Sequence, residues 1–157
     1  MSRRHRAEKR EIATDPLYDS LVLAKFINKL MQHGKKTLSY KIVYNAMQRF
    51  ASKVNIDNPL EAFEQALENA KPSLEVKSRR IGGATYQVPI EIAADRREAL
   101  AMRWIIRNAR AKAGRSMEDG LLGELTDCFN NQGATIKKKD ETHRMAEANK
   151  AFAHYKW

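Results

Sequence analysis

The chain has 157 residues, with 29 Lys and Arg against 19 Asp and Glu, and carries a net charge of +10. Its length favours one domain, and its 43% hydrophobic content is too high for a disordered chain. No apolar run approaches the ~20 residues of a membrane-spanning helix, and the basic start leads into no apolar signal segment. Cys128 is the single cysteine, which excludes an intrachain disulfide and favours a reducing compartment. These features indicate a soluble, basic protein with a polyanionic partner.

Charge is distributed unevenly along the chain. Residues 1–53, 76–115 and 135–157 are rich in Lys and Arg, whereas residues 54–75 and 116–134 are acidic. Solvated surface alone can explain any one such block. Three basic blocks in one short chain favour a nucleic acid as the partner, with some elements facing it and others facing water.

The first part of the chain predicts a basic arm followed by helices. Residues 1–14 lack apolar periodicity and are predicted to form a flexible arm. Apolar residues at helical spacing predict one helix over residues 20–33, which Gly34 ends. They predict a second helix over residues 36–54, with Leu38 among the residues of its core face.

A third helix has the clearest end signals. Asn58 is predicted to cap it, with Pro59 at its first position and Glu61 completing a capping-box pattern. Pro72 is predicted to end it, because proline cannot continue a helix.

The apolar period then changes from 3.6 to 2. Apolar and polar side chains alternate on both sides of Gly82 and Gly83, which predicts a β-hairpin arm over residues 74–92. Pro89 cannot donate a hydrogen bond to a neighbouring strand, and a lone hairpin is only marginally stable. We therefore predict an arm that leans on another element.

Three more helices are predicted after the hairpin. Asp95 is predicted to cap the fourth, which ends at Gly114, and Ser116 to cap the fifth, which ends near Gly133. The sixth is predicted to run from about Ile136 to the C-terminal residues. The predicted fold is mainly α: a six-helix domain with a protruding β-hairpin arm and a flexible basic N-terminal arm.

The fourth helix is the most informative element. Ile105 and other apolar residues lie on one side of it, and Asp95 and Glu98 are the acids nearest to its arginines. Two acids cannot pair with all of the arginines of this helix, so some arginines remain available to bind an anion. The planar guanidinium group suits phosphate oxygens. Trp104 flanks the arginines and is interpreted as a core residue. Four arginines fall within a wedge of ~60° at 100° per residue: Arg96, Arg103, Arg107 and Arg110.

The hairpin carries a second group of cations. Lys77, Arg79 and Arg80 precede its Gly-Gly tip. A thin basic ribbon can enter a groove of folded RNA, although charges on an exposed strand also simply prevent aggregation. Tyr86 is interpreted either as a brace for the hairpin or as a contact for a partner protein.

No pattern typical of an enzyme or a metal site is present. His143 and His154 would lie ~16 Å apart along a helix axis, so they cannot share a metal. Cys128 lies among apolar residues and is interpreted as a core side chain. Lys35 and Lys36 follow a glycine, but the earlier glycine of a nucleotide-binding P-loop is absent. We predict no enzymatic activity, no cofactor and no metal.

Several strings of residues resemble one protein family over essentially the whole chain, in order. They are the arm at residues 2–12, the Asp15-Pro16 and Gly34-Lys35-Lys36 elements, the hairpin string at 76–89, the string at 96–104 and the C-terminal string at 137–155. Together they closely resemble the family of the seventh small-subunit ribosomal protein, bacterial type.

The resemblance implies a single RNA-binding domain over residues 1–157 that binds ribosomal RNA (rRNA) as part of a ribosome, cytoplasmic or organellar, without a membrane partner. It implies direct binding to the 3′ major domain of the small-subunit rRNA and nucleation of head assembly. It also implies a place near the exit tRNA site and the mRNA path, beside head and platform proteins.

Together, the charge pattern and the resemblance predict a set of rRNA-binding cations: Arg3, Arg4, Arg6, Lys35, Lys36, Lys77, Arg79, Arg80, Arg96, Arg97, Arg103, Arg107, Arg110, Lys137 and Lys138. A second set is predicted to contact the exit site or neighbouring proteins: Gly82, Gly83, Tyr86, Arg144 and Tyr155.

The residues by themselves leave two other classes of protein open. A DNA-binding regulator or nucleoid protein would also use basic helices and a β-arm, and would prefer duplex DNA over RNA in competition. An RNA-processing enzyme would have to show metal-dependent turnover of RNA.

Overall fold

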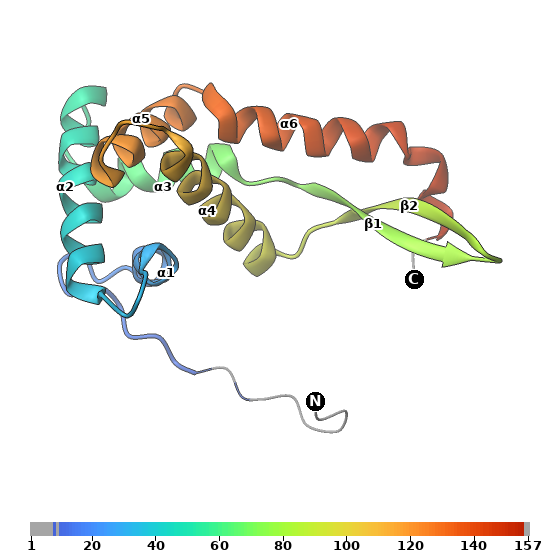
Figure 1. Cartoon of the computed structure of the whole chain (residues 1–157), viewed down its shortest axis with the longest axis horizontal. Helices are drawn as coiled ribbons and strands as arrows, with labels where there is room; N and C mark the ends of the chain where they lie inside the picture. The colour runs from blue at the N-terminus through green and yellow to red at the C-terminus, as the bar shows by residue number, and fades with distance from the viewer. Residues whose placement is uncertain (1–7, 9, 156–157) are drawn as a thin grey trace.

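A computed structural model describes residue 8 and residues 10–155. The predicted arm cations Arg3, Arg4 and Arg6 lie outside these residues, and the described residues 10–14 form neither helix nor strand. Figure 1 shows a helical body at one end and a long extension at the other, in which the hairpin and the last long helix run side by side.

The predicted mainly α fold with a β-hairpin is confirmed. The described residues form six α-helices, a two-stranded antiparallel sheet and a short 3-10 helix. In chain order they are α1 (Leu21–Leu30), α2 (Lys36–Val54), α3 (Pro59–Ala70), β1 (Leu74–Ile81), β2 (Ala84–Glu91), α4 (Ala94–Ala111), α5 (Met117–Phe129), α6 (Gly133–Ala148) and η1 (Lys150–Tyr155).

Three helices begin at polar caps, of which Asn58 and Ser116 were predicted as caps and Ser20 only as the first residue of its helix. The side chains of Ser20, Asn58 and Ser116 accept hydrogen bonds from backbone N–H groups in the first turns of α1, α3 and α5. The capping box predicted for α3 is incomplete. The Glu61 carboxylate accepts from the side-chain amide of Asn58 at 3.0 Å and not from a backbone N–H.

The predicted start of α4 and both predicted ends of α6 were wrong, and α1 ends at Leu30 instead of continuing to residue 33. Ala93 precedes α4 and has no side chain that can cap it, whereas Asp95 lies within the first turn. α6 begins at Gly133, earlier than predicted, and ends at Ala148, where η1 replaces the expected continuation. Gly133 has a φ of +87°, and a Cβ there would lie 2.7 Å from the Asp127 side chain. Gly133 therefore begins α6 at a point where its backbone lies too close to Asp127 to carry a side chain.

The core lies in the body, where α5 packs against α2, α3 and α4. Phe26 and Phe63 are fully buried and meet edge to face, with ring centroids 5.1 Å apart. Cys128 is also fully buried, and this burial raises the pKa of its thiol to about 12. Its interpretation as a core side chain is confirmed.

Two buried carboxylates connect segments of the chain. Asp15 accepts backbone N–H bonds from Tyr18 and Ser20 at 2.9 Å and a bond from the Tyr44 hydroxyl at 3.1 Å, which fixes the entry to α1. Glu124 accepts from both the backbone N–H and the hydroxyl of Thr135, at 3.1 and 2.6 Å, and so ties α5 to the start of α6. Hydrogen bonds of this kind offset the desolvation of a buried carboxylate.

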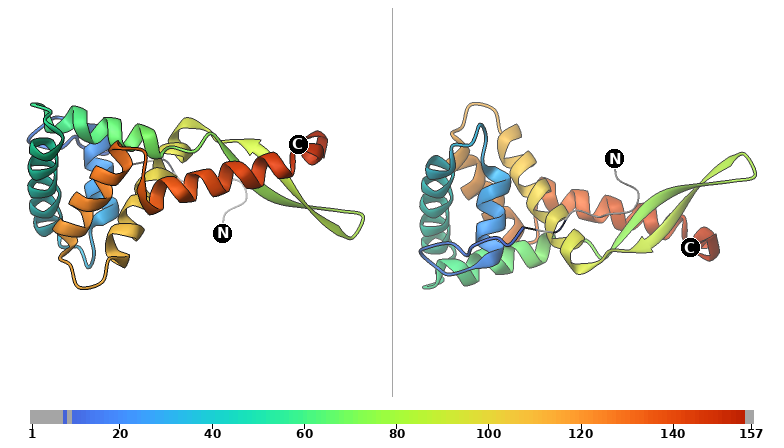
Figure 2. Two further views of the ribbon diagram at one scale, coloured as in Figure 1. Left: turned by 90° about the horizontal axis from the view of Figure 1, so that it is seen from above. Right: turned by 90° about the horizontal axis from the view of Figure 1, so that it is seen from below.

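The hairpin turns at Gly82 and Gly83, whose φ values of +56° and +88° give the left-handed two-residue turn that the sequence predicts. The hairpin leans on α6 and η1, as Figure 2 shows from two sides. The Tyr86 ring lies 5.4 Å from Phe152 and 5.1 Å from Tyr155, both in η1. Tyr86 thus braces the hairpin, which is one of its two predicted roles.

Candidate nucleic-acid interface

The predicted arginine stripe on α4 divides into two pairs. Arg96 donates to both carboxylate oxygens of Glu75 in β1, with distances of 2.8–3.1 Å, and so fixes the base of the hairpin. Arg110 donates to the carbonyl oxygen of Leu30 at the end of α1, at 2.8 Å. Each of these two arginines therefore has a structural contact that helical spacing did not reveal.

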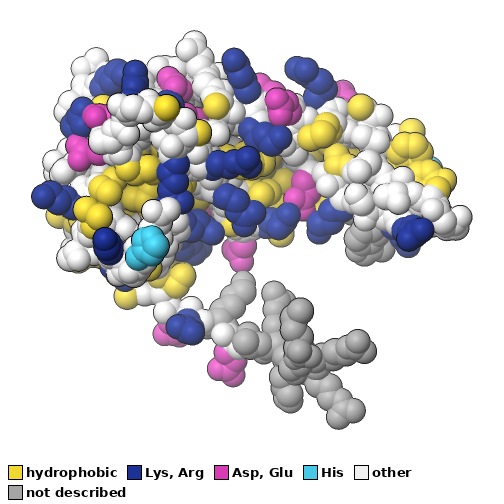
Figure 3. Space-filling view, in the orientation of Figure 1, with side chains coloured by type: hydrophobic (Ala, Val, Ile, Leu, Met, Phe, Trp, Pro, Cys, Tyr) yellow, Lys and Arg dark blue, Asp and Glu magenta, His cyan; other side chains and the backbone are white. Residues whose placement is uncertain are grey.

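The other pair carries its charge on the open surface. Arg103 and Arg107 are exposed, and neither forms a hydrogen bond or ion pair with the residues that the structure describes. Together with Lys29, Ile106 and Arg110 they line a groove of about 310 Å³, which we call the α4 groove. None of these lining residues is acidic. Figure 3 shows Lys and Arg side chains gathered over this part of the molecule.

Two polar contacts hold α1 against α4 near the α4 groove. Lys25 pairs with Glu98 at 3.1 Å, and Arg110 bonds to the carbonyl of Leu30. Glu98, which the sequence suggested as a partner for an arginine of α4, thus forms an ion pair with a lysine of α1 instead. Because α1 is anchored on both sides of Lys29, the backbone positions that carry the cations of the groove are held relative to one another.

The α1–α2 connection brings Lys35 and Lys36 beside the start of a helix. His33 and Gly34 both adopt left-handed backbone conformations, with φ of +53° and +72°. α2 then begins without a side-chain cap and without an acidic residue in its first turn. Its unpaired N–H groups and two lysines create a positive potential that suits an anion.

The hairpin cations do not form one group. Lys77 is exposed and lies 3.8 Å from the Glu75 carboxylate, and Arg79 donates to the carbonyl oxygen of Tyr155. Arg80 is exposed on the opposite face of the strand, because successive residues alternate. Arg97, at the base of the hairpin, is half-buried and donates to the carbonyl of Ile92 at 3.4 Å.

The remaining predicted residues lie along the extension. Lys137 and Arg144 are exposed on α6, and Lys138 forms an ion pair with Glu141 at 3.2 Å. Gly82 and Gly83 are exposed at the hairpin tip, whereas Tyr155 is half-buried against Tyr86. The structure therefore brings Arg103, Arg107 and Arg110 together, and leaves the hairpin and α6 cations at separate places.

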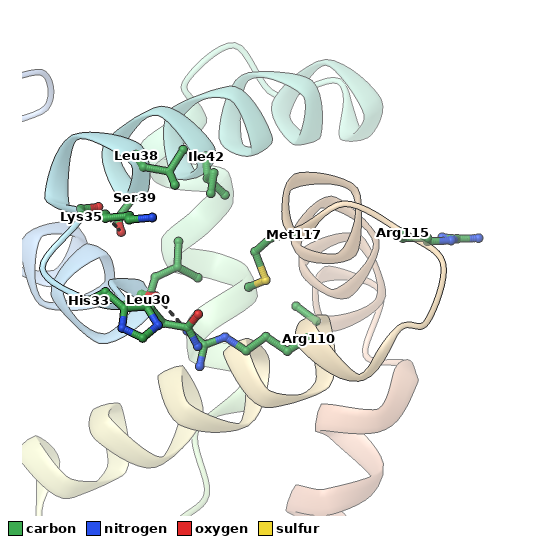
Figure 4. Close-up of a pocket in the computed structure, with 11 residues that line it drawn as sticks. Leu30, His33, Lys35, Leu38, Ser39, Ile42, Arg110, Arg115 and Met117 are labelled. Carbon is green, nitrogen blue, oxygen red and sulfur yellow. Dashed lines mark hydrogen bonds between the residues drawn. The ribbon is translucent and has the colours of Figure 1, made fainter.

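A pocket beside the α4 groove escaped the sequence analysis. It has a volume of about 370 Å³ and lies where α1, α2, α4 and α5 meet (Figure 4). Leu38, predicted as a core residue, lines it and remains 51% exposed. No sequence signal could have found this pocket, since its walls come from four separate helices.

The described part of the chain lacks two other kinds of feature. None of its helices is both long enough and apolar enough to span a bilayer. Residues 8 and 10–155 also contain no group of three or more His, Cys, Asp or Glu side chains placed to hold a metal ion.

These features define a class of small, basic, mainly helical proteins with a cationic face and a β-hairpin extension. Comparison with known proteins identifies the family, because the model of the family "Ribosomal protein S7p/S5e" matches residues 2–150. Three similar proteins, each named "Small ribosomal subunit protein uS7", come from Protochlamydia amoebophila, Chlamydia abortus and Chlamydia pneumoniae. They are 73%, 71% and 68% identical to this chain over 157 residues, which is 100% of both chains in each case.

The chain belongs to this family of ribosomal proteins, and the predicted resemblance is confirmed. The family consists of structural ribosomal proteins and not of enzymes, which also agrees with the sequence analysis.

Proposed function

We propose that this chain is a structural protein of the small ribosomal subunit in the cytoplasm and that it binds the 3′ major domain of the small-subunit rRNA directly. By neutralising phosphates of RNA helices that would otherwise repel one another, it nucleates folding of the head. The names of its relatives support the assignment to the small subunit, and the cationic surface supports direct RNA binding.

The α4 groove is the observation that carries this proposal. Arg103 and Arg107 have no partner among the described residues, and no acidic side chain lines the groove. Arginine pairs bidentately with phosphate oxygens, so two such side chains one helical turn apart on α4 suit neighbouring phosphates of an RNA backbone. Lys35 and Lys36, at the uncapped start of α2, extend the same positive potential.

We propose a second role for the extension. The exposed Gly82-Gly83 tip and Arg144 of α6 reach toward the exit tRNA site and mRNA path, and toward neighbouring head and platform proteins. The thin two-stranded form of the hairpin supports this, because a ribbon without a side chain at its tip can enter a narrow space between RNA and protein.

Salt dependence of binding tests direct rRNA contact. If about 8 phosphates are neutralised, log affinity for a 3′-domain RNA fragment falls against log salt with a slope of roughly −6 to −7. The variants Arg103→Ala and Arg107→Ala should each reduce the slope by about 1 while the melting temperature stays unchanged. A slope near zero for the parent chain would overturn the proposal.

Arg49 provides a matched control. Its side chain is 50% exposed, but its guanidinium forms ion pairs with Glu118 and Asp119, each at 2.9 Å. It lines neither the α4 groove nor the pocket beside it. Arg49→Ala should leave the slope unchanged. Competition with duplex DNA at physiological salt completes the test, since a preference for the duplex would favour a DNA-binding protein instead.

A further inference from the structure

We propose that the pocket between α1, α2, α4 and α5 receives one unstacked nucleotide of the bound RNA. This inference rests on the proposed function and deepens it, because it assigns a base-binding site beside the phosphate-binding groove. We call the pocket the nucleotide pocket.

The floor of the nucleotide pocket is apolar. The side chains of Leu30, Leu38, Ile42 and Met117 converge on it from α1, α2 and α5, as the labelled residues of Figure 4 show. Leu38 remains 51% exposed at the mouth of this apolar surface. Apolar side chains of this kind can contact the face of an unstacked base.

The rim of the pocket is cationic. Lys35 and Arg110 extend toward the cavity and His33 lies at its edge, whereas Arg115 points away in Figure 4. None of the lining residues is acidic. An apolar floor under a cationic rim matches a nucleotide, whose base is planar and whose phosphate is negative.

Arg110 connects the nucleotide pocket to the α4 groove. It lines both cavities, and its bond to the Leu30 carbonyl at 2.8 Å holds it as the wall between them. An RNA strand whose phosphates follow Arg103 and Arg107 therefore passes directly beside the pocket. Proteins that recognise RNA commonly bind bases splayed out of single-stranded loops and bulges. A base attached to a phosphate in the α4 groove would have to pass only the Arg110 side chain to enter the pocket.

Polar groups near the floor can contact the base edge. The Gln32 amide lines the pocket, and the Ser39 hydroxyl, which is almost fully buried, donates to the Lys35 carbonyl at 3.2 Å. That hydroxyl keeps its lone pairs available to a donor on a base. The volume of about 370 Å³ falls at the small end of ligand pockets, as one nucleotide requires.

The test compares base loss in the RNA with side-chain loss in the pocket. A 3′-domain RNA fragment is prepared with single abasic sites at its unpaired positions, and its affinity for the full chain is measured. We expect one abasic site to weaken binding by about fivefold or more without changing the salt slope. Leu38→Ala should weaken binding of the intact RNA similarly and should add little when that abasic RNA is used.

Leu21→Ala is the matched control, because Leu21 is 42% exposed on α1 and lines neither cavity. It should bind intact and abasic RNA like the parent chain. The inference is overturned if no abasic site weakens binding, or if the losses from Leu38→Ala and from the abasic site simply add. The abasic series with the unchanged protein can overturn the inference even if Leu38→Ala proves unstable, and Ile42→Ala in the same wall then replaces Leu38→Ala in the comparison. A steep salt slope with no abasic effect would leave the proposed function standing and remove only the nucleotide pocket.

Discussion

The body and the extension of this molecule are held together by different kinds of contact. The body has a continuous core of buried aliphatic and aromatic side chains, among them Phe26 and Phe63. The extension has few buried apolar side chains, and its hairpin is fixed by the Arg96–Glu75 pair, the Ser73–His143 hydrogen bond and the Tyr86 ring against η1. The body therefore sets global stability, whereas the extension can open locally without unfolding the rest.

The largest expected effect comes from the body. Phe63→Ala removes a fully buried ring that meets Phe26 edge to face, and should lower the free energy of unfolding by about 3–5 kcal/mol in urea denaturation. The control is Phe152→Ala, which removes a half-buried ring in η1 and should cost about 1 kcal/mol or less. Equal losses from the two variants would erase the distinction between body and extension.

The second effect lies where the two regions join. Glu124→Ala leaves the buried N–H and hydroxyl of Thr135 without their acceptor and should cost about 1–3 kcal/mol. Glu124→Gln retains an acceptor oxygen and should recover part of the loss. Urea unfolding of both variants measures the difference, and a Gln variant no more stable than the Ala variant would contradict this account.

A smaller, local effect is expected in the extension. Tyr86→Ala removes the ring that Phe152 and Tyr155 contact, so amide hydrogen exchange in β1 and β2 should become faster. Amides in α2 and α5 should keep their protection, and the global free energy of unfolding should change by about 1 kcal/mol or less. Faster exchange throughout the body would show that the extension is not an independent unit.

The smallest effect depends on pH. Burial, followed by the nearby charge of Lys139, lowers the pKa of His143, whose Nε2 accepts the Ser73 N–H at 2.9 Å. In the unfolded chain His143 takes up a proton near pH 6.5, whereas in the folded chain it does so only at lower pH. The Ser73–His143 contact therefore contributes its full stabilisation to the folded state above pH 6.5. Its contribution should be lost as pH falls from about 6.5 through the lowered pKa.

NMR can follow this loss through the Ser73 amide shift, together with urea unfolding between pH 7.5 and 5. In His143→Gln the unfolding free energy should show a weaker dependence over the same range. An unchanged dependence in that variant would assign the effect to other groups.

Local signals in the sequence predicted most of the helices and the hairpin, because caps and turns depend on neighbouring residues. The side chains of Ser20 and Asn58 cap their helices, and Gly82 and Gly83 form the left-handed turn of the hairpin. Gly133 was misassigned because a glycine that begins a helix looks in the sequence like one that ends the previous helix, and its close approach to the Asp127 side chain arises only in the folded chain.

The candidate site was only partly predictable, since helical spacing gives the face of a residue but not what lies opposite. Arg96 meets a carboxylate 21 residues earlier in the chain, and Arg110 a carbonyl 80 residues earlier. Arg103 and Arg107 look the same in the sequence and have no such partner among the described residues. The exposure of Leu38 is likewise decided by helices far from it in the sequence.

The length of the hairpin has a mechanical consequence. Each strand has eight residues, which at about 3.3 Å per residue makes a lever of about 26 Å. A rotation of about 10° at its base therefore displaces the Gly82-Gly83 tip by about 4–5 Å. The ion pair at Glu75 lies near the base of this lever, whereas Tyr86 contacts the rings of η1 close to the tip, so the second contact opposes such a rotation and its loss would free the tip to move.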